Sequence, residues 1–225
     1  HLGSNKIRGL ISKITDHLRE NGCEIYYHKK MKEFIFTEGE VSGIKCADGE
    51  VFNSNCVVLA VGHSAHDIYR HCEESGVAMT PKDFAVGVRV EHARMDMDRL
   101  QFGNFAGHES LGTARYRLSW HDKTTDLGTY SFCMCPGGYV LSSGTDADGI
   151  VVNGMSNYAR NSRWSNSALV VTVKNNFSLQ NVLNGLDYQR GIEKKAFLLS
   201  KKYASGKEIP AQTIEQFMAG KSANI

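Results

Sequence analysis

Two short segments of this sequence carry residue types that could do chemistry. The first is the turn Gly62-His63-Ser64, which follows an apolar run over residues 57–61. A half-exposed strand alternates apolar and polar residues, so this run predicts a strand with two buried faces. Glycine at its end lets a ligand approach the main chain closely, which makes the turn a candidate cofactor site. A plain strand-to-helix connection, with Ser64 as the helix N-cap, is the alternative.

The second segment is Cys133-Met134-Cys135, followed by a Pro136–Gly138 turn. Residues two apart on a strand point to the same face, so both sulfurs are expected to reach a common partner. Zinc needs four ligands, and the sequence has no second cysteine pair at the spacing of a zinc module, so we predict no metal. A thiol role beside a cofactor or substrate stays open, as does simple packing. The Pro136–Gly138 turn is predicted to line the site.

Polar residues on two further segments are candidates for ligand contact. Strand alternation places Arg89 and Glu91 on one face and His92 on the other. An arginine that faces a pocket clamps a carboxylate or phosphate, whereas a solvated strand face with a surface ion pair is the alternative. The small polar residues from Asn153 to Ser156 form a turn that contacts a ligand or serves only as a loop. No Ser-His-Asp order, paired-carboxylate spacing or phosphate-binding lysine loop supports a hydrolase or a kinase, and no catalytic residue is assigned.

The composition is that of an ordinary folded protein. The chain has 225 residues, of which 41% are hydrophobic and 22% are charged. Its 26 Lys+Arg and 24 Asp+Glu give a net charge of +2, and the basic residues are scattered, so nothing favours binding to nucleic acid. The longest apolar stretch is far shorter than the roughly 20 residues of a membrane span. We expect no membrane association, a cytoplasmic location and reduced thiols at the six cysteines.

The first third of the chain has the pattern of a nucleotide-binding sheet. Apolar residues at helical spacing predict a helix from Lys6 to Glu20. A short helix from Ala65 to Ser75 is predicted after the Gly62 turn. Between these helices the sequence predicts strands and a three-stranded meander over residues 23–27, 34–36, 41–46, 51–52 and 57–61.

The sequence pattern changes in the rest of the chain. From Val77 to Val173 the segments are short, rich in Val, Tyr, Phe and Thr, and separated by Gly, Asn and Asp, which predicts a mainly antiparallel β domain. Two late helices are predicted over residues 184–203 and 212–218, so the fold class is α+β. The predicted strands cover residues 84–91, 114–120, 129–135, 139–143, 150–155 and 169–174.

Several blocks, taken together, resemble a known family. The meander leads into Ala60-Val61-Gly62-His63-Ser64-Ala65, which resembles the Ala-Thr-Gly-type turn beside the flavin in flavoproteins with two dinucleotide-binding domains. Three other blocks are Phe84–His92, Phe132–Gly138 and Val152–Ser156, and they are flanked by Leu2–Lys6 and Pro210–Gln212. Together with the turn, these blocks resemble a bacterial family of uncharacterised FAD-dependent dehydrogenases.

This resemblance implies a fold, a cofactor and a set of site residues. Residues 1–75 would be part of a three-layer FAD/NAD(P)-binding, Rossmann-like domain, and residues 76–225 a β-rich substrate or cap domain with C-terminal helices. The intact protein would be an FAD-dependent oxidoreductase acting on an unknown small molecule. The implied cofactor-binding residues are Ala60, Gly62, His63 and Ser64. The implied substrate-site residues are Arg89, Cys133, Cys135, Gly137, Gly138, Asn153 and Ser156.

Two parts of the family pattern are missing. Members begin with a glycine-rich turn that holds the FAD pyrophosphate at a helix N-terminus, and no G-x-G-x-x-G occurs in this sequence. Members also usually close over the flavin with a later C-terminal glycine-acid segment, which this sequence lacks as well. We therefore expect an internal fragment whose partners are the N- and C-terminal parts of its own chain, and which is inactive and lacks FAD on its own. A non-catalytic flavoprotein-like scaffold and a thiol-based redox or metal sensor are the alternatives.

Overall fold

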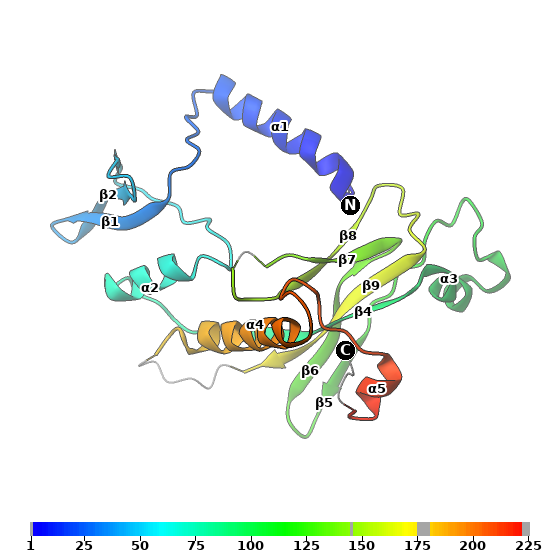
Figure 1. Cartoon of the computed structure of the whole chain (residues 1–225). Coiled ribbons are helices and arrows are strands. Elements are labelled where there is room, and N and C mark those ends of the chain that lie inside the picture. Colours follow the sequence, from blue (N-terminus) through cyan, green and yellow to red (C-terminus); the bar gives the residue numbers. More distant parts are fainter. Residues whose placement is uncertain (1, 145, 175–180, 222–225) are drawn as a thin grey trace. The chain divides into compact units, whose positions relative to one another are not determined.

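The structure is a computed structural model that describes residues 2–144, 146–174 and 181–221 (Figure 1). It divides into two compact units, and each is described by itself. The sheet unit comprises His1–Leu10, Lys82–Asn176 and Asp187–Ile225, and the meander unit comprises Ile11–Pro81 and Phe177–Leu186. Helices combined with antiparallel sheets make the fold α+β, as the sequence predicted.

The meander unit contains the predicted three-stranded antiparallel sheet. Its strands β1 (Met31–Thr37), β2 (Glu40–Cys46) and β3 (Val51–Asn53) follow one another in sheet order. Helix α2 (His66–Glu74) lies next to β1, because the Phe34 amide donates a hydrogen bond to Nε2 of His71 at 3.1 Å. The buried apolar core of this unit within the described residues is small, consisting of Cys46, Ile68, Cys72 and Leu183.

The predicted N-terminal helix is confirmed as α1 (Ser4–Glu20). It buries none of its residues, so its apolar stripe is open to solvent. The exposed fractions of the stripe are 48% at Ile7, 40% at Leu10, 57% at Ile11, 47% at Ile14 and 43% at Leu18.

Two predicted strands of this region are wrong. Residues 23–27 and 57–61 form no strand, and no described strand pairs with either. The prediction that the apolar run is buried on two faces also fails, since Val58 is 84% exposed. A strand with two buried faces needs hydrogen-bonded neighbours and covering layers, and the described residues supply neither.

The sheet unit is built on a four-stranded antiparallel sheet in the order β4-β9-β6-β5. β4 (Phe84–Ala93) and β9 (Trp164–Val173) pair along their whole length, and β6 (Leu127–Cys135) lies on the other side of β9. A separate hairpin consists of β7 (Gly138–Ser142) and β8 (Val152–Ser156). The predicted strand over residues 114–120 is largely wrong, because β5 (Ser119–Asp122) begins only near its end.

Four helical segments belong wholly or mainly to this unit. Helix α3 (Arg94–Phe102) and the short 3-10 helix η1 (Gly103–Phe105) were not predicted, since α3 has no apolar stripe at helical spacing. The two predicted late helices are confirmed as α4 (Asn184–Tyr203) and α5 (Ile214–Met218). Thr213 and Gln216 form a reciprocal capping box at the start of α5.

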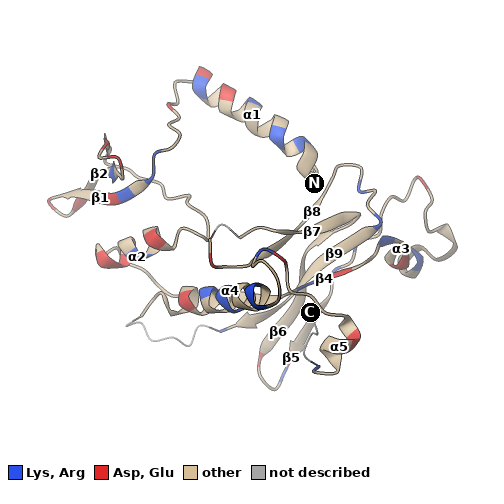
Figure 2. Cartoon of the chain, in the orientation of Figure 1, with Lys and Arg blue, Asp and Glu red and all other residues tan. Residues whose placement is uncertain are grey.

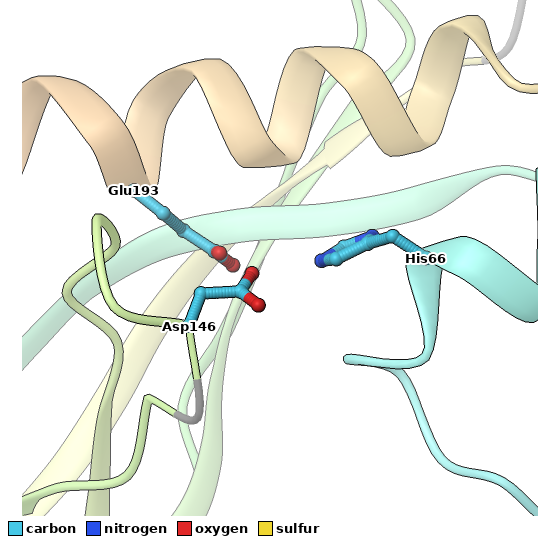
Figure 3. Close-up of side chains that lie close together, drawn as sticks. All are labelled: His66, Asp146 and Glu193. Atoms are coloured by element: carbon cyan, nitrogen blue, oxygen red, sulfur yellow. The ribbon is translucent and has the colours of Figure 1, made fainter. Parts of the chain in front are cut away.

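Helix α4 is held to the loop between β7 and β8 by backbone and charged contacts. The Ile150 amide donates a hydrogen bond to the Glu193 carbonyl at 3.1 Å. Figure 3 shows the carboxylate side chains of Glu193 and Asp146 near each other at this place. Arg190 forms ion pairs with Asp146 and, at 3.2 Å, with Asp148. A hydrogen bond from Lys194 holds the pKa of Asp148 below its usual value, so the loop is anchored to α4 at neutral pH.

Charges of both signs alternate along individual helices. Figure 2 shows basic and acidic residues on α1 and again on α4. No helix within the described residues is long and apolar enough to cross a membrane.

Candidate functional site

Arg89 lies at the centre of a polar cluster in the sheet unit. From β4 it donates hydrogen bonds to the Cys133 carbonyl at 3.2 Å, to Asn166 Oδ1 at 2.6 Å and to Asn153 Oδ1 at 3.4 Å. The acceptors come from β6, β9 and β8, so three of the sequence-predicted substrate-site residues meet here. We call Arg89, Cys133, Cys135, Asn153 and Asn166 the Arg89 cluster. All three acceptors are neutral oxygens, so within the described residues no carboxylate compensates the guanidinium charge.

The cluster is closely packed, with Cys135 and Asn166 buried, Arg89 half-buried, and Cys133 and Asn153 exposed. A Cβ atom at Gly154 would lie 2.2 Å from Arg89 Nη1 and 2.8 Å from Cys135 Sγ. Asn166 is fully buried, and its Nδ2 has no hydrogen-bond partner among the described residues. Ser156 on β8 is 2% exposed, and its Oγ also has no hydrogen-bond partner among the described residues. An unsatisfied buried polar group costs about 1–3 kcal/mol, so this arrangement is not one that stability alone favours.

A β-bulge separates the two cysteines of the cluster. The pairing of β6 with β9 shifts between Phe132 and Cys135, and Cys133 has a left-handed φ of 47°. Cys133 is exposed while Cys135 is 3% exposed, so the expectation that both side chains share one strand face is wrong. The bulged residue interrupts the alternation on which that expectation rested.

The two thiols are expected to differ in reactivity toward an alkylating reagent. Burial raises the pKa of Cys135, the adjacent Cys133 thiol raises it further, and the Arg89 guanidinium opposes both. In native protein at neutral pH, Cys135 should react with iodoacetamide at least about tenfold more slowly than Cys133. Peptide mass spectrometry after timed quenching measures both rates, with exposed Cys23 as the reference. Equal native rates at the two positions would contradict this burial.

The glycines of the Pro136–Gly138 turn pack against protein backbone. A Cβ at Gly137 would lie 1.8 Å from the Arg160 carbonyl oxygen, and one at Gly138 would lie 2.2 Å from that of Met155. The Gly137 amide also donates to Ser165 Oγ at 2.9 Å. Both glycines are buried, so the structure gives them a packing function beside the cluster.

The Gly62 turn lies in the meander unit and is open. Ala60, Gly62 and His63 are exposed, and a Cβ at Gly62 would find nothing within 4 Å. Gly62 has a φ of 74°, a conformation that favours glycine. Ser64 does not cap α2, because the N-cap position is Ala65, and its Oγ lies 3.2 Å from Nε2 of His63. The Gly62 carbonyl accepts a hydrogen bond from the Tyr69 hydroxyl at 2.9 Å, so the turn is open on the side of the Gly62 Cα, where a cofactor could approach.

An open groove lies over β5 and β6 of the sheet unit. It has a volume of about 1060 Å³ and is lined by residues 116–121 and 128–134, which include no carboxylate. Its apolar surface includes Trp120, 64% exposed, and Phe132, 62% exposed. Cys133 lines the groove and also accepts a hydrogen bond from Arg89, so the Arg89 cluster borders it. This volume is in the range of small-molecule sites.

Tyr116 lines the same groove and was not among the residues predicted from the sequence. Its hydroxyl lies 2.9 Å from Nε2 of His92 on β4. Burial raises the pKa of Tyr116, and the Ser167 hydroxyl and the Arg89 guanidinium nearby lower it in part. The Arg89 cluster and the Tyr116–His92 pair are therefore electrostatically connected.

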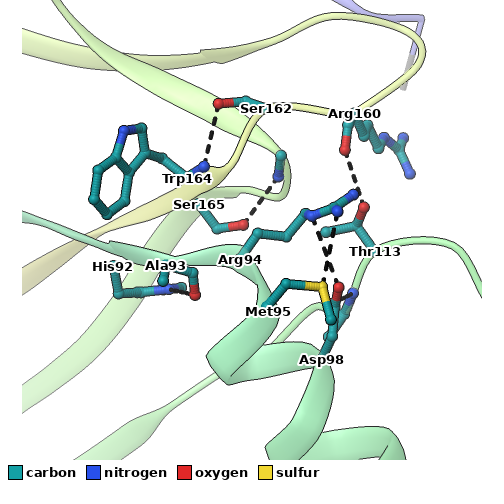
Figure 4. A network of polar contacts seen from close by, with 12 residues as sticks. His92, Ala93, Arg94, Met95, Asp98, Thr113, Arg160, Ser162, Trp164 and Ser165 are labelled. Carbon is teal, nitrogen blue, oxygen red and sulfur yellow. Dashed lines mark hydrogen bonds and ion pairs between the residues drawn. The ribbon is translucent and has the colours of Figure 1, made fainter. Parts of the chain in front are cut away.

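A buried aspartate fixes the segment that carries Tyr116. Asp98 of α3 is 1% exposed and accepts a hydrogen bond from the Ala114 amide at 2.7 Å. Arg94 Nε lies 3.8 Å from the same carboxylate, and Thr113 donates to the Arg160 carbonyl at 3.0 Å (Figure 4). These bonds take the place of the strand pairing that the sequence predicted for residues 114–118.

An α+β chain with a half-buried arginine beside an open groove is suited to binding a small molecule. Comparison with known families gives the class: residues 83–225 match the family described as FAD-dependent protein, C-terminal domain-like. The chain belongs to this family of FAD-dependent proteins. It is also 35% identical over 219 residues to an uncharacterized protein from Clostridium beijerinckii, and it spans 40% of the length of that relative.

Proposed function

We propose that this chain is part of an FAD-dependent oxidoreductase and supplies the substrate-side wall of its active site. The observation that carries the proposal is the half-buried Arg89 guanidinium, whose hydrogen bonds within the described residues all go to neutral acceptors. A cation that is partly removed from water and has no carboxylate partner is suited to bind an anionic group of a ligand. FAD, when bound, supplies hydride acceptance, and the protein binds and orients the reactants.

We further propose that the intact protein is of the type with two dinucleotide-binding domains. In this proposal residues 1–75 belong to the FAD-binding, Rossmann-like domain and residues 76–225 to the substrate domain. The turn at Gly62, His63 and Ser64 fits one edge of a cofactor, because Gly62 and His63 are exposed and nothing lies within 4 Å of a Cβ position at Gly62. A glycine-rich pyrophosphate-binding turn would then come from another part of a longer chain.

Exposed apolar surfaces support a larger assembly of this kind. The apolar stripe of α1 and the apolar run over residues 57–61 are both exposed, with Val58 at 84%. Patches of this sort mark surfaces that other protein segments cover. The relative from C. beijerinckii is long enough to supply such segments, since the chain spans only 40% of its length.

The proposal is tested on the intact protein and on the 225-residue chain. The intact protein should carry flavin, seen as a visible absorption band that bleaches with NADH or NADPH under anaerobic conditions. The 225-residue chain should retain none, because contacts through the Gly62 turn alone are too few to offset the cost of ordering a cofactor. Intact protein purified without flavin would refute the proposal.

The same assay tests Arg89 directly. Arg89→Met in the intact protein should keep its flavin and lose about tenfold or more in the rate of reduction by the anionic nicotinamide, since a hydrogen bond to a charged group contributes about 1.5–3 kcal/mol. Arg163→Met is the matched control, because this arginine lies over the Trp164 ring, outside the Arg89 cluster. An unchanged rate in Arg89→Met would remove the cluster from the active site.

A further inference from the structure

The phenol of Tyr116 is already paired with a potential proton acceptor. Its hydroxyl oxygen lies 2.9 Å from Nε2 of His92, and the two rings are 5.5 Å apart between centroids. Tyr116 is half-buried and lines the groove over β5 and β6, while His92, on β4, is half-buried and is not among the groove-lining residues. A side chain that contacts a ligand site and a histidine at once is the arrangement that general acid–base catalysis requires.

The other ring nitrogen of His92 determines the direction of this hydrogen bond. Nδ1 lies 3.3 Å from the carbonyl oxygen of Ala93, which can only accept. This contact favours the tautomer of neutral His92 with the hydrogen on Nδ1, in which Nε2 accepts from the Tyr116 hydroxyl. In this tautomer the Ala93 carbonyl orients the imidazole, and Nε2 is positioned to receive the phenol proton of Tyr116.

The surroundings of the pair favour a protonated phenol in the resting state and an anion in the groove. Arg89 is the charged group that acts on the Tyr116 hydroxyl, and the Ser167 hydroxyl is its other polar neighbour. The residues that line the groove include Arg117 and no carboxylate, while His121, which also lines it, lies 2.9 Å from the Asp126 carboxylate. Negative charge that develops on a bound molecule near Tyr116 is therefore met by the guanidinium groups of Arg89 and Arg117.

We propose that Tyr116 is the catalytic proton acceptor for a substrate bound in this groove, and that His92 is the positioning residue that takes the phenol proton in turn. The substrate class is a small alcohol or amine with an apolar or aromatic body, which the exposed rings of Trp120 and Phe132 would contact. This inference rests on the proposed oxidoreductase function, because removing hydride from such a compound requires that its O–H or N–H proton leave as well.

The step balances within the chain. The substrate O–H or N–H bond breaks and its proton forms a new O–H bond at Tyr116 Oη. The original phenol proton moves to His92 Nε2 over the 2.9 Å contact. The products are a substrate anion, an unchanged tyrosine and an imidazolium, and no electron is transferred in this step.

The first test reads the histidine tautomer in the 225-residue chain without flavin. Nitrogen-15 NMR of the imidazole rings, with His92 assigned from His92→Gln, should show the Nδ1–H tautomer with Nε2 as acceptor. Tyr116→Phe should shift the Nε2 signal because the donated hydrogen bond is lost, and Tyr130→Phe, a change in another tyrosine that lines the groove, should not. An Nε2–H tautomer in the wild-type chain would overturn the relay, since Tyr116 would then be the acceptor.

The second test follows proton transfer with 4-nitrophenol as the probe. Below the probe's own pKa, the wild-type chain should bind it as the coloured phenolate, and Tyr116→Phe should reduce the bound phenolate at least about tenfold. Tyr139→Phe, a change in an exposed tyrosine of β7 outside the groove, should stay within about twofold of wild type. No phenolate band with wild type, or an equal band with Tyr116→Phe, would overturn the proposal. Neither test needs flavin, so intact protein without FAD would refute only the proposed function.

Discussion

Replacing Gly154 by alanine should break the Arg89 cluster and lower the free energy of unfolding by about 4 kcal/mol. The new Cβ would lie 2.2 Å from Arg89 Nη1 and 2.3 Å from Asn166 Oδ1. The arginine tip can move aside, but Asn166 is short and fully buried, so the 2.6 Å hydrogen bond between them is lost. Overpacking costs about 1–3 kcal/mol, and a hydrogen bond to a charged group contributes about 1.5–3 kcal/mol.

Urea denaturation and thermal unfolding measure this loss. A chain of this size should melt about 8–16 °C lower for a change of that magnitude. Gly191→Ala is the matched control: it lies within α4 with nothing near its Cβ position, so it should stabilise the chain by about 0.5–1 kcal/mol. If Gly154→Ala instead unfolds at the same urea concentration and the same temperature as the wild type, the close packing around Arg89 is not present in solution.

Local patterns were sufficient to predict most of the elements. The apolar periodicity from residue 184 to 203 predicted a helix with the bounds that α4 has. The meander was equally visible, because its turns at Glu38-Gly39 and Asp48-Gly49 carry their own signal and both glycines have positive φ. Signals of this kind are contained within a few residues and do not depend on the rest of the fold.

The apolar run over residues 57–61 shows where such a pattern misleads. Its composition predicts the environment that the segment requires, which is burial on both faces. Burial is supplied by other segments, and within the described residues no strand pairs with it, so Val58 is 84% exposed. A sequence pattern can indicate that neighbours are needed without showing that they are present.

The candidate site was predicted only in part for a related reason. Arg89, Cys133 and Asn153 were candidates because of their residue types and expected positions on strands and turns, and the structure joins them across separations of 44 and 64 residues. No periodicity reports such a contact. The bulge at Cys133 arises in the pairing of β6 with β9, which interrupts the alternation along the strand. The contact of Tyr116 with His92 joins a segment without strand structure to β4, and no local pattern indicates it.

Asp98 is the clearest case of a residue whose importance is set by distant contacts, and its removal should destabilise the sheet unit by about 3 kcal/mol. Asp98→Ala leaves the buried Ala114 amide without its 2.7 Å acceptor and Arg94 without its carboxylate. Breaking a buried ion pair by removing one partner costs about 3–5 kcal/mol, and the lower value applies because the Arg94 side chain is 29% exposed.

Three comparisons in urea denaturation separate the contributions. Asp98→Asn keeps an oxygen for the Ala114 amide and loses only the charge, so its loss should be the smaller one. Asp96→Ala on the same helix should change little, because its pair with Arg99 is exposed. Since Ala114 precedes Tyr116 by two residues, Asp98→Ala should also broaden the imidazole NMR signals of His92, and Asp96→Ala should not. If Asp96→Ala and Asp98→Ala destabilise the chain equally, Asp98 does not anchor the segment that positions Tyr116.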